Sequence, residues 1–192
     1  HGRCRDDWGN WWGANNSTPM IQFVMDDHYM RRNPFVAPPD LRFIARDGQW
    51  GLYPISRILS HYSEYVSPPA GQPGQFTSAC GTIVYRDSLL GEKLADNLFV
   101  SEPVHNLVHR RLIERDGLLR HPRKPPEEEG REFLRSRDSW FRPTSLRTGP
   151  DGCLWIADMY RMVIEHPEWI DDELEKSLDL RAGHSLGRIY RD

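Results

Sequence analysis

The chain has 192 residues and a mass of 22.4 kDa, the size of one domain or of one large part of a bigger domain. Its 25 Lys and Arg against 28 Asp and Glu give a net charge of −3, which argues against the clustered positive surface of a broad nucleic-acid binder. Seven each of Trp, Tyr and Phe argue against disorder, and 15 Pro with 15 Gly favour short strands and many turns.

The N-terminal part of the chain combines one short strand with long turn-rich segments. A Gly- and Asn-rich stretch precedes Ile21–Met25, a run of mainly apolar residues that predicts a strand. Proline-rich segments at 31–40 and 67–75 have no periodicity, so we predict loops there.

The central part has the pattern of an antiparallel meander. Its apolar and β-branched runs predict strands, and Asp116-Gly117 is typical of a tight turn from which the chain returns. The four predicted strands are 82–85, 98–100, 107–113 and a returning strand that starts at Leu118.

The charged segment His121–Glu132 (HPRKPPEEEGRE) is interpreted as a solvated surface loop. After it we predict a strand at Thr144–Arg147, a turn at 149–152 and a buried strand at Leu154–Asp158.

The last part of the chain is predicted to hold a short helix over Asp172–Leu178 and a final strand over Gly187–Arg191. Asp171 or Asp172 would cap the helix, and the acids near its start favour the helix dipole.

Two strands share one pattern, which is a weak internal repeat. Leu98–Glu102 and Leu154–Asp158 each have three large apolar residues, a small residue and an acid. Repeats of about 40–50 residues per four strands are typical of propeller blades. A β-sandwich is the alternative.

Two histidines four residues apart, His105 and His109, share a face on a helix or on a strand, as in some metal sites. A polar cluster at a strand end is the alternative. Acids at strand ends, such as Asp26 and Asp158, suit either Ca²⁺ or the capping of a turn.

Two further groups of charged residues leave their role open. Arg161 and Glu165 are spaced as a surface pair on a helix, and they also follow a buried strand, where functional sites concentrate. Arg32 and its neighbours supply donors for an anionic ligand or are simply solvated on a loop.

Several classes of site have no sequence signal here. The three cysteines, Cys4, Cys80 and Cys153, form no zinc or haem motif and are interpreted as ordinary small side chains. No apolar run approaches the ~18 residues of a membrane-spanning helix, and no signal peptide is visible.

Five segments of the chain, in the same order, resemble one known family. The resemblance is to large secreted proteins of planctomycetes and verrucomicrobia that are known as membrane-bound dehydrogenases. The segments are DDHYMRRNP (26–34), YPISR (53–57), SEPVHNLVHR (101–110), WFRPTSLRTGPDGCLWIADMYRMVIEHPEWI (140–170) and DLRAGHSLGRIYR (179–191).

The resemblance implies a mostly β fold, the C-terminal portion of a β-propeller like that of soluble quinoprotein glucose dehydrogenase, with long loops and a short helix. At about 40–45 residues per blade, residues 1–192 would make about three to four blades, so we expect a fragment whose other blades precede His1. In the resembled family HEAT-like repeats and a cytochrome c domain often follow, in a periplasmic or secreted protein. This chain has no Cys-x-x-Cys-His haem attachment motif.

The implied activity is oxidation of a sugar or alcohol with pyrroloquinoline quinone and Ca²⁺, with electrons passed to haem. Ligands of propellers bind where loops converge at one end of the channel. His105 is the expected base and Arg32 the expected cofactor anchor. The resembling positions supply catalytic candidates (His105, Asp158, Tyr160), cofactor-binding candidates (Arg32, Asn33, Asn106, Arg161) and metal candidates (Asp26, Glu102).

Two other functions fit the same sequence. A non-catalytic propeller would bind polysaccharide or a protein partner in the cell envelope through Trp8, Trp11 and Trp12, because exposed aromatic rings stack on sugars and anchor interfaces. These tryptophans are also good core residues. Alternatively, the segment only completes a ring whose site lies elsewhere.

Overall fold

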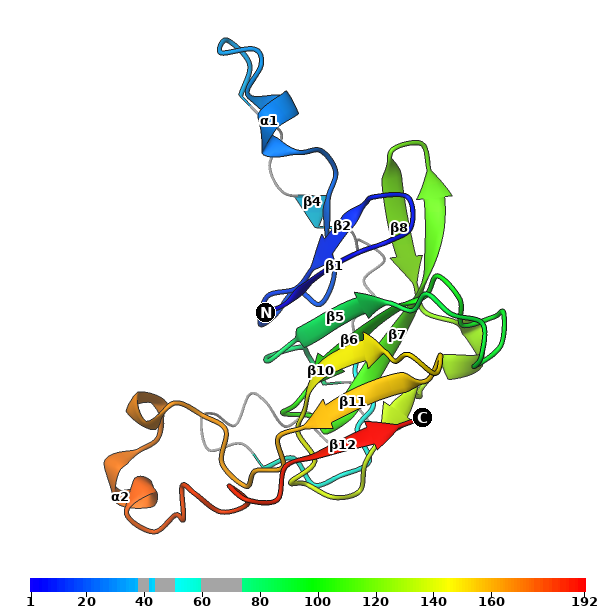
Figure 1. Ribbon diagram of the computed structural model, residues 1–192. Helices are drawn as coiled ribbons and strands as arrows, with labels where there is room; N and C mark the ends of the chain where they lie inside the picture. Colours follow the sequence, from blue (N-terminus) through cyan, green and yellow to red (C-terminus); the bar gives the residue numbers. More distant parts are fainter. Residues whose placement is uncertain (38–41, 44–50, 60–73) are drawn as a thin grey trace.

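The structure is a computed structural model that describes residues 1–37, 42–43, 51–59 and 74–192 (Figure 1). These ranges form three antiparallel sheets with very little helix, which confirms the mostly β prediction. No helix in the described ranges is long and apolar enough to cross a membrane. Most of the predicted loop at 67–75 lies outside the described residues. The last residues of the predicted loop at 31–40 also lie outside them.

The first sheet has its strands in chain order. They are β1 (Arg3–Arg5), β2 (Trp11–Gly13), β3 (Ile21–Phe23) and β4 (Arg42–Phe43). The predicted strand is therefore β3, which ends two residues early because a backbone turn begins where Asp26 accepts a hydrogen bond from Tyr29. The short helix α1 (Asp27–Met30) follows and projects away from the sheets (Figure 1).

The second sheet is the predicted meander. It contains β5 (Cys80–Val84), β6 (Leu98–Glu102), β7 (Leu107–Asp116) and β8 (Leu119–Arg123), and β9 (Leu134–Arg135) also pairs with β7. Gly117 turns the chain from β7 into β8 with a φ of 56°, a backbone conformation that glycine adopts without strain.

The third sheet has three strands and confirms the remaining strand predictions. They are β10 (Pro143–Thr148), β11 (Leu154–Asp158) and β12 (Arg188–Arg191). The predicted helix is shorter than expected: α2 spans Asp172–Glu175, with Asp171 as its cap accepting from the backbone N–H groups of Glu173 and Leu174.

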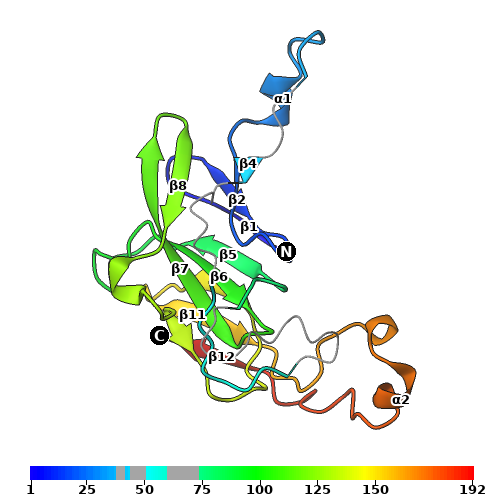
Figure 2. The same ribbon diagram turned by 180° about the vertical axis from the view of Figure 1, so that it is seen from behind.

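The first strands of the three sheets pack together, with β5 between β1 and β10 (Figures 1 and 2). Two apolar clusters form the core. One contains Trp12, Met20 and Leu52 with residues of the second sheet, and the other joins Phe99 of the second sheet to Ile156 of the third. The repeated strands β6 and β11 are both central in their sheets, and both end in a buried acid, at Glu102 and Asp158.

Two sequence interpretations were wrong. The segment 121–132 is not a solvated loop, because β8 takes its first residues, a 3-10 turn spans Pro126–Glu128, and Glu128 and Glu132 are buried against side chains of β7. The segment 160–166 is not helical, so Arg161 and Glu165 do not form a helical pair there. The backbone of this segment leaves β11 through Tyr160, whose φ of 51° is not that of a right-handed helix.

Candidate functional site

The β6 corner consists of Glu102, His105 and Asn106, and all three residues are buried. Glu102 ends β6, and both of its carboxylate oxygens are used by the chain that precedes β5. The backbone N–H groups of Thr77 and Ser78 donate to Oε2 at 3.3 and 3.1 Å, and the hydroxyls of both residues donate to Oε1. Four donors therefore fix the orientation of this carboxylate.

His105 lies in the turn between β6 and β7, with no exposed surface. Its Nδ1 is 3.3 Å from Oε1 of Glu102, so Nδ1 carries a proton toward the carboxylate. Its Nε2 is buried and has no hydrogen-bond partner within the described ranges. The ring abuts the backbone of Gly74, where a Cβ atom would come within 2.8 Å of Nε2.

Asn106 holds the corner together. Its Nδ2 donates to the backbone carbonyls of Phe141 and Ser139 at 2.6 and 3.1 Å, and its Oδ1 accepts from the Ser56 hydroxyl at 2.6 Å. Its φ of 57° is one that asparagine tolerates better than most residues. The amide of Asn106 is thus committed to protein contacts.

The β11 corner consists of Asp158, Tyr160 and Arg161. Oδ1 of Asp158 accepts from the backbone N–H groups of Arg142 and Tyr160, each at 2.8 Å. Its Oδ2 has no hydrogen-bond partner in the part of the chain that the structure describes, and it lies 3.8 Å from Nε of Arg188. Burial raises the pKa of Asp158.

Tyr160 and Arg161 form the outer part of this corner. The guanidinium of Arg188 lies 3.8 Å from the centre of the Tyr160 ring, and the Trp140 ring lies 5.8 Å from it, centre to centre. Its hydrogen bond to Asp138 raises the pKa of the phenol. Nη1 of Arg161 donates to the carbonyl of Arg181 at 3.0 Å. Both side chains are partly exposed, unlike those of the β6 corner.

Arg142 joins the two corners, and the sequence interpretation missed it. Its guanidinium donates to Pro103 and Val104 in the β6–β7 turn, and burial lowers its pKa to about 10. It also donates to carbonyls of three other residues, Leu59, Arg161 and Met162. The only signal in the sequence is an arginine between an aromatic residue and a proline just before a predicted strand.

His109 belongs to a separate buried pair with Glu132. Nδ1 of His109 is 2.5 Å from Oε2 of Glu132, while Nε2 accepts from Nε of Arg111 at 2.8 Å. The ring is therefore neutral, and burial lowers the pKa of His109. Burial acts to raise the pKa of Glu132, but His109 and Lys124 outweigh it and lower that pKa. The sequence interpretation missed Glu132, because it placed this residue on a solvated loop.

The structure does not join the two histidines into one site. His105 pairs with Glu102 and His109 pairs with Glu132. Within the described ranges, no three His, Cys, Asp or Glu side chains gather in a way that could hold a metal ion.

The segment 26–37 contains α1, projects away from the sheets and is called the arm below (Figure 1). Three of the predicted site residues lie on it and are exposed: Asp26, Arg32 and Asn33. The Arg32 guanidinium covers the Tyr29 ring at 4.6 Å, and Oδ1 of Asn33 accepts from the backbone of Phe35. The arm stands apart from β6 and β11, so these residues do not join either corner.

The three tryptophans of the N-terminal stretch have different roles. Trp12 is a core residue whose Nε1 donates to Asp6 at 3.3 Å. Trp8 and Trp11 are 53% and 41% exposed, and each has a guanidinium over its ring. The cysteines are free thiols, and burial raises the pKa of Cys4 and Cys80 to about 12.

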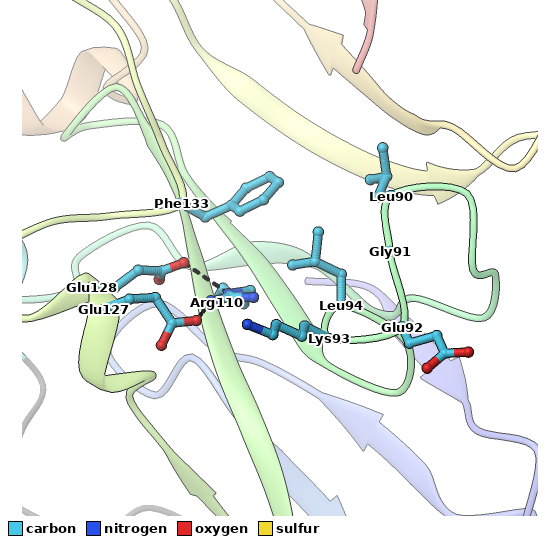
Figure 3. Close-up of a pocket in the computed structure, with 9 residues that line it drawn as sticks. All are labelled: Leu90, Gly91, Glu92, Lys93, Leu94, Arg110, Glu127, Glu128 and Phe133. Carbon is cyan, nitrogen blue, oxygen red and sulfur yellow. Dashed lines mark hydrogen bonds and ion pairs between the residues drawn. The ribbon is translucent and has the colours of Figure 1, made fainter.

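A hollow of about 540 Å³ lies beside β7, between the loop 90–94 and the 3-10 turn (Figure 3). Leu90, Leu94 and Phe133 supply its apolar side. Its charged side is occupied by the protein itself, because Arg110 binds both Glu127 and Glu128 at 2.8 and 2.7 Å. None of the predicted site residues lines this hollow.

The whole chain, residues 1–192, matches one family model, described as a domain of unknown function (DUF7133), and the chain therefore belongs to that family. No curated protein and no solved structure matches the chain.

Proposed function

We propose that this chain is part of a β-propeller oxidoreductase that acts on a hydroxyl group of a sugar or alcohol, with the β6 corner as its proton acceptor. One observation carries the proposal: Glu102 holds His105 at Nδ1, and Nε2 makes no hydrogen bond in the part of the chain that the structure describes. An imidazole oriented by a carboxylate on one nitrogen, with the other nitrogen free, is a suitable general base.

The chemistry assigned to these residues is a single proton transfer. Nε2 of His105 takes the hydroxyl proton, and Glu102 stabilises the imidazolium that forms. The four hydrogen bonds to Glu102 hold it in position, so no reorientation is needed when the charge develops. The quinone of the resembled family would accept the hydride that leaves the same carbon.

Three of the candidate residues do not suit the roles expected of them in holding Ca²⁺ and the cofactor. Both oxygens of Glu102 are occupied by Thr77 and Ser78, which leaves no free lone pair directed at Ca²⁺, and Asp26 lies on the arm. The amide of Asn106 is likewise committed. We therefore assign no step to Ca²⁺ or to a cofactor bound by these residues. Electron transfer to a haem domain and a periplasmic location remain part of the proposal through the resemblance alone.

The propeller architecture is supported by the packing of the sheets. In a propeller, four-stranded antiparallel sheets pack around an axis, with one strand of each nearest the centre. Here β1, β5 and β10 are the first strands of their sheets and pack side by side. Each sheet would then be one blade, in keeping with the lower limit of three to four blades.

Access to His105 is a specific requirement of the proposal. The ring has no exposed surface and Nε2 faces Gly74, so a substrate must displace the segment at Gly74 to reach it. Gly74→Ala places a methyl group against Nε2 and should therefore reduce turnover more than it reduces stability.

The direct test is reduction of an artificial electron acceptor by the protein with pyrroloquinoline quinone, Ca²⁺ and a panel of sugars and alcohols. His105→Gln should lower kcat/KM by about 100-fold or more, the usual contribution of a general base. His121→Gln is the matched control, because His121 is exposed on β8. Absence of acceptor reduction with every substrate, or equal activity of His105→Gln, would exclude this function.

A second candidate function, binding of polysaccharide, is favoured by Trp8 and Trp11. Their rings remain 53% and 41% exposed although Arg115 and Arg5 each cover part of them. Exposed indole rings stack on sugars. Titration with a panel of glycans should then change tryptophan fluorescence in the protein and not in the Trp8→Ala, Trp11→Ala double variant. No change with any glycan would argue against sugar binding.

A further inference from the structure

We propose that the hollow beside β7 binds a small organic acid, with the carboxylate on Arg110 and Lys93 and the apolar part against Leu94 and Phe133. No residue of the β6 corner or the β11 corner lines this hollow. The inference therefore concerns a separate binding site and does not depend on the function proposed above.

Arg110 lines the hollow from β7, and two acids hold it unequally. Its side chain is 5% exposed, and its Nε lies 2.7 Å from Glu128, whose side chain is 11% exposed. Its Nη2 donates to Glu127 at 2.8 Å, but the side chain of Glu127 is 62% exposed. Because an exposed ion pair adds little stability, a ligand carboxylate can displace Glu127 while Glu128 keeps Arg110 in position.

Lys93 supplies a second cation at the same end of the hollow. Its ammonium group points toward Arg110 and Glu127 (Figure 3). A backbone hydrogen bond and Arg110 lower the pKa of Glu127, and the nearby charge of Lys93 adds to this effect. A carboxylate that takes the place of Glu127 therefore meets two cations.

The charges at this end favour an anion over a cation. With Glu127 displaced, two cations face the single negative charge of Glu128, so one carboxylate restores neutrality. Glu92 also lines the hollow, but it points away from these groups (Figure 3). A protonated amine would approach the same two cations, which repel it. Oε2 of Glu128 makes no hydrogen bond within the described ranges, but it is buried and out of reach of the amine.

The apolar lining selects an acid that has a hydrophobic body. Phe133 lies on one side of the hollow, and Leu90 and Leu94 lie on the other (Figure 3). All three side chains are half-buried, because they pack against the apolar cluster around Phe99 and keep part of their surface exposed. The volume of about 540 Å³ suits a small molecule, whose sites usually measure about 300–1,000 Å³. An apolar group in the hollow removes this surface from water and adds to the affinity of the carboxylate.

The test is calorimetric titration of the full chain with phenylacetate, which has a ring and a carboxylate. Acetate is the control without the ring, and phenethylamine is the control with the opposite charge. Phenylacetate should bind about tenfold more tightly than acetate, because its ring buries apolar surface, and more tightly than phenethylamine. Its binding should change the amide chemical shifts of Gly91, Leu94 and Phe133, which line the hollow.

Two exposed residues of opposite charge should change the affinity in opposite directions. Lys93→Ala should weaken the binding of phenylacetate by about threefold, the effect of losing one exposed ion pair. Glu127→Gln should tighten it by a similar factor, because the variant lacks the internal competitor for Arg110. Glu92→Gln is the matched control, since it removes an acid of the same lining that points away from Arg110.

Three outcomes would overturn the proposal. The first is no binding of phenylacetate, or binding that leaves the amide shifts of the hollow unchanged. The second is equal or tighter binding of acetate or of phenethylamine. The third is a Glu127→Gln variant that binds phenylacetate no more tightly than Glu92→Gln does, which would show that Glu127 does not compete for the site.

Discussion

The β6 and β11 corners have the same backbone design and different accessibility. In each, an acid ends the central strand of a sheet and accepts hydrogen bonds from the chain just before the first strand. Glu102 uses both oxygens and is wholly buried. Asp158 uses only Oδ1 for hydrogen bonds to the described residues, and it adjoins the partly exposed Tyr160. The repeated acid therefore serves first to hold the end of its strand to the neighbouring chain. Its surroundings decide whether a carboxylate oxygen is left that could accept a further hydrogen bond.

Arg142, which connects the corners, should produce the largest effect when it is replaced. Arg142→Met leaves the carbonyls of Pro103, Val104 and Met162 without their donor, so the free energy of unfolding should fall by about 3–5 kcal/mol. Urea denaturation measures this fall. Arg142→Lys should recover part of the loss, because an ammonium donates to fewer carbonyls. A loss below about 1 kcal/mol would mean that the corners are held together by other contacts.

Glu102→Gln tests the β6 corner, where both carboxylate oxygens of Glu102 accept hydrogen bonds. The amide nitrogen of Gln is a donor, and it would face donors from Thr77 and Ser78, so the free energy of unfolding should fall by about 2–3 kcal/mol. Thermal unfolding gives the measurement. Glu92→Gln, at an exposed acid of the 90–94 loop, is the control and should have little effect.

The buried pair of His109 and Glu132 should make the free energy of unfolding dependent on pH. His109 has a lowered pKa, so below about 6.5 the unfolded state binds a proton that the folded state excludes. Glu132 has a lowered pKa as well, and its contribution is lost as the pH falls further, through its folded pKa. Stability should thus decrease from pH 7 to pH 4.

His109→Gln isolates the first part of that decrease, since an amide can still donate to Glu132 and accept from Arg111. Chemical denaturation at a series of pH values should show a shallower slope between about pH 6.5 and pH 5. An unchanged slope there would show that another group is responsible.

Asp158→Asn should have the smallest effect of the four. The variant keeps Oδ1 for the backbone N–H groups of Arg142 and Tyr160 and changes only Oδ2, which makes no hydrogen bond within the described ranges. The unfolding free energy should change by less than about 1 kcal/mol. A loss as large as that of Glu102→Gln would show that the corners do not differ in the way proposed.

Strand prediction succeeded where the local pattern was strong. The runs at 82–85, 98–100 and 154–158 became β5, β6 and β11 because β-branched and aromatic residues favour extended backbone and supply the core. The helix α2 was predicted with Asp171 or Asp172 as its cap; the structure selects Asp171, and the helix ends three residues early.

The structure brings some of the predicted site residues together, while their roles stay predictions. His105 lies beside Glu102 at the end of β6, and Asn106 follows it in the same turn. Asp26 and Arg32 were grouped with them, but the arm carries both residues away from the sheets. Glu132 was missed because its partner, His109, is 23 residues away in sequence. No local pattern predicts such a contact.

The sequence by itself determined the mostly β class, the order of the strands in the central meander and the acid at the end of each repeated strand. These features depend on local periodicity and on turn residues, which a short segment contains completely. Only the tertiary structure decided that Arg142 joins the two corners, and that both oxygens of Glu102 but only one oxygen of Asp158 accept hydrogen bonds within the described ranges. Each of these depends on which distant segments pack together, so burial and partners were fixed only when the sheets met.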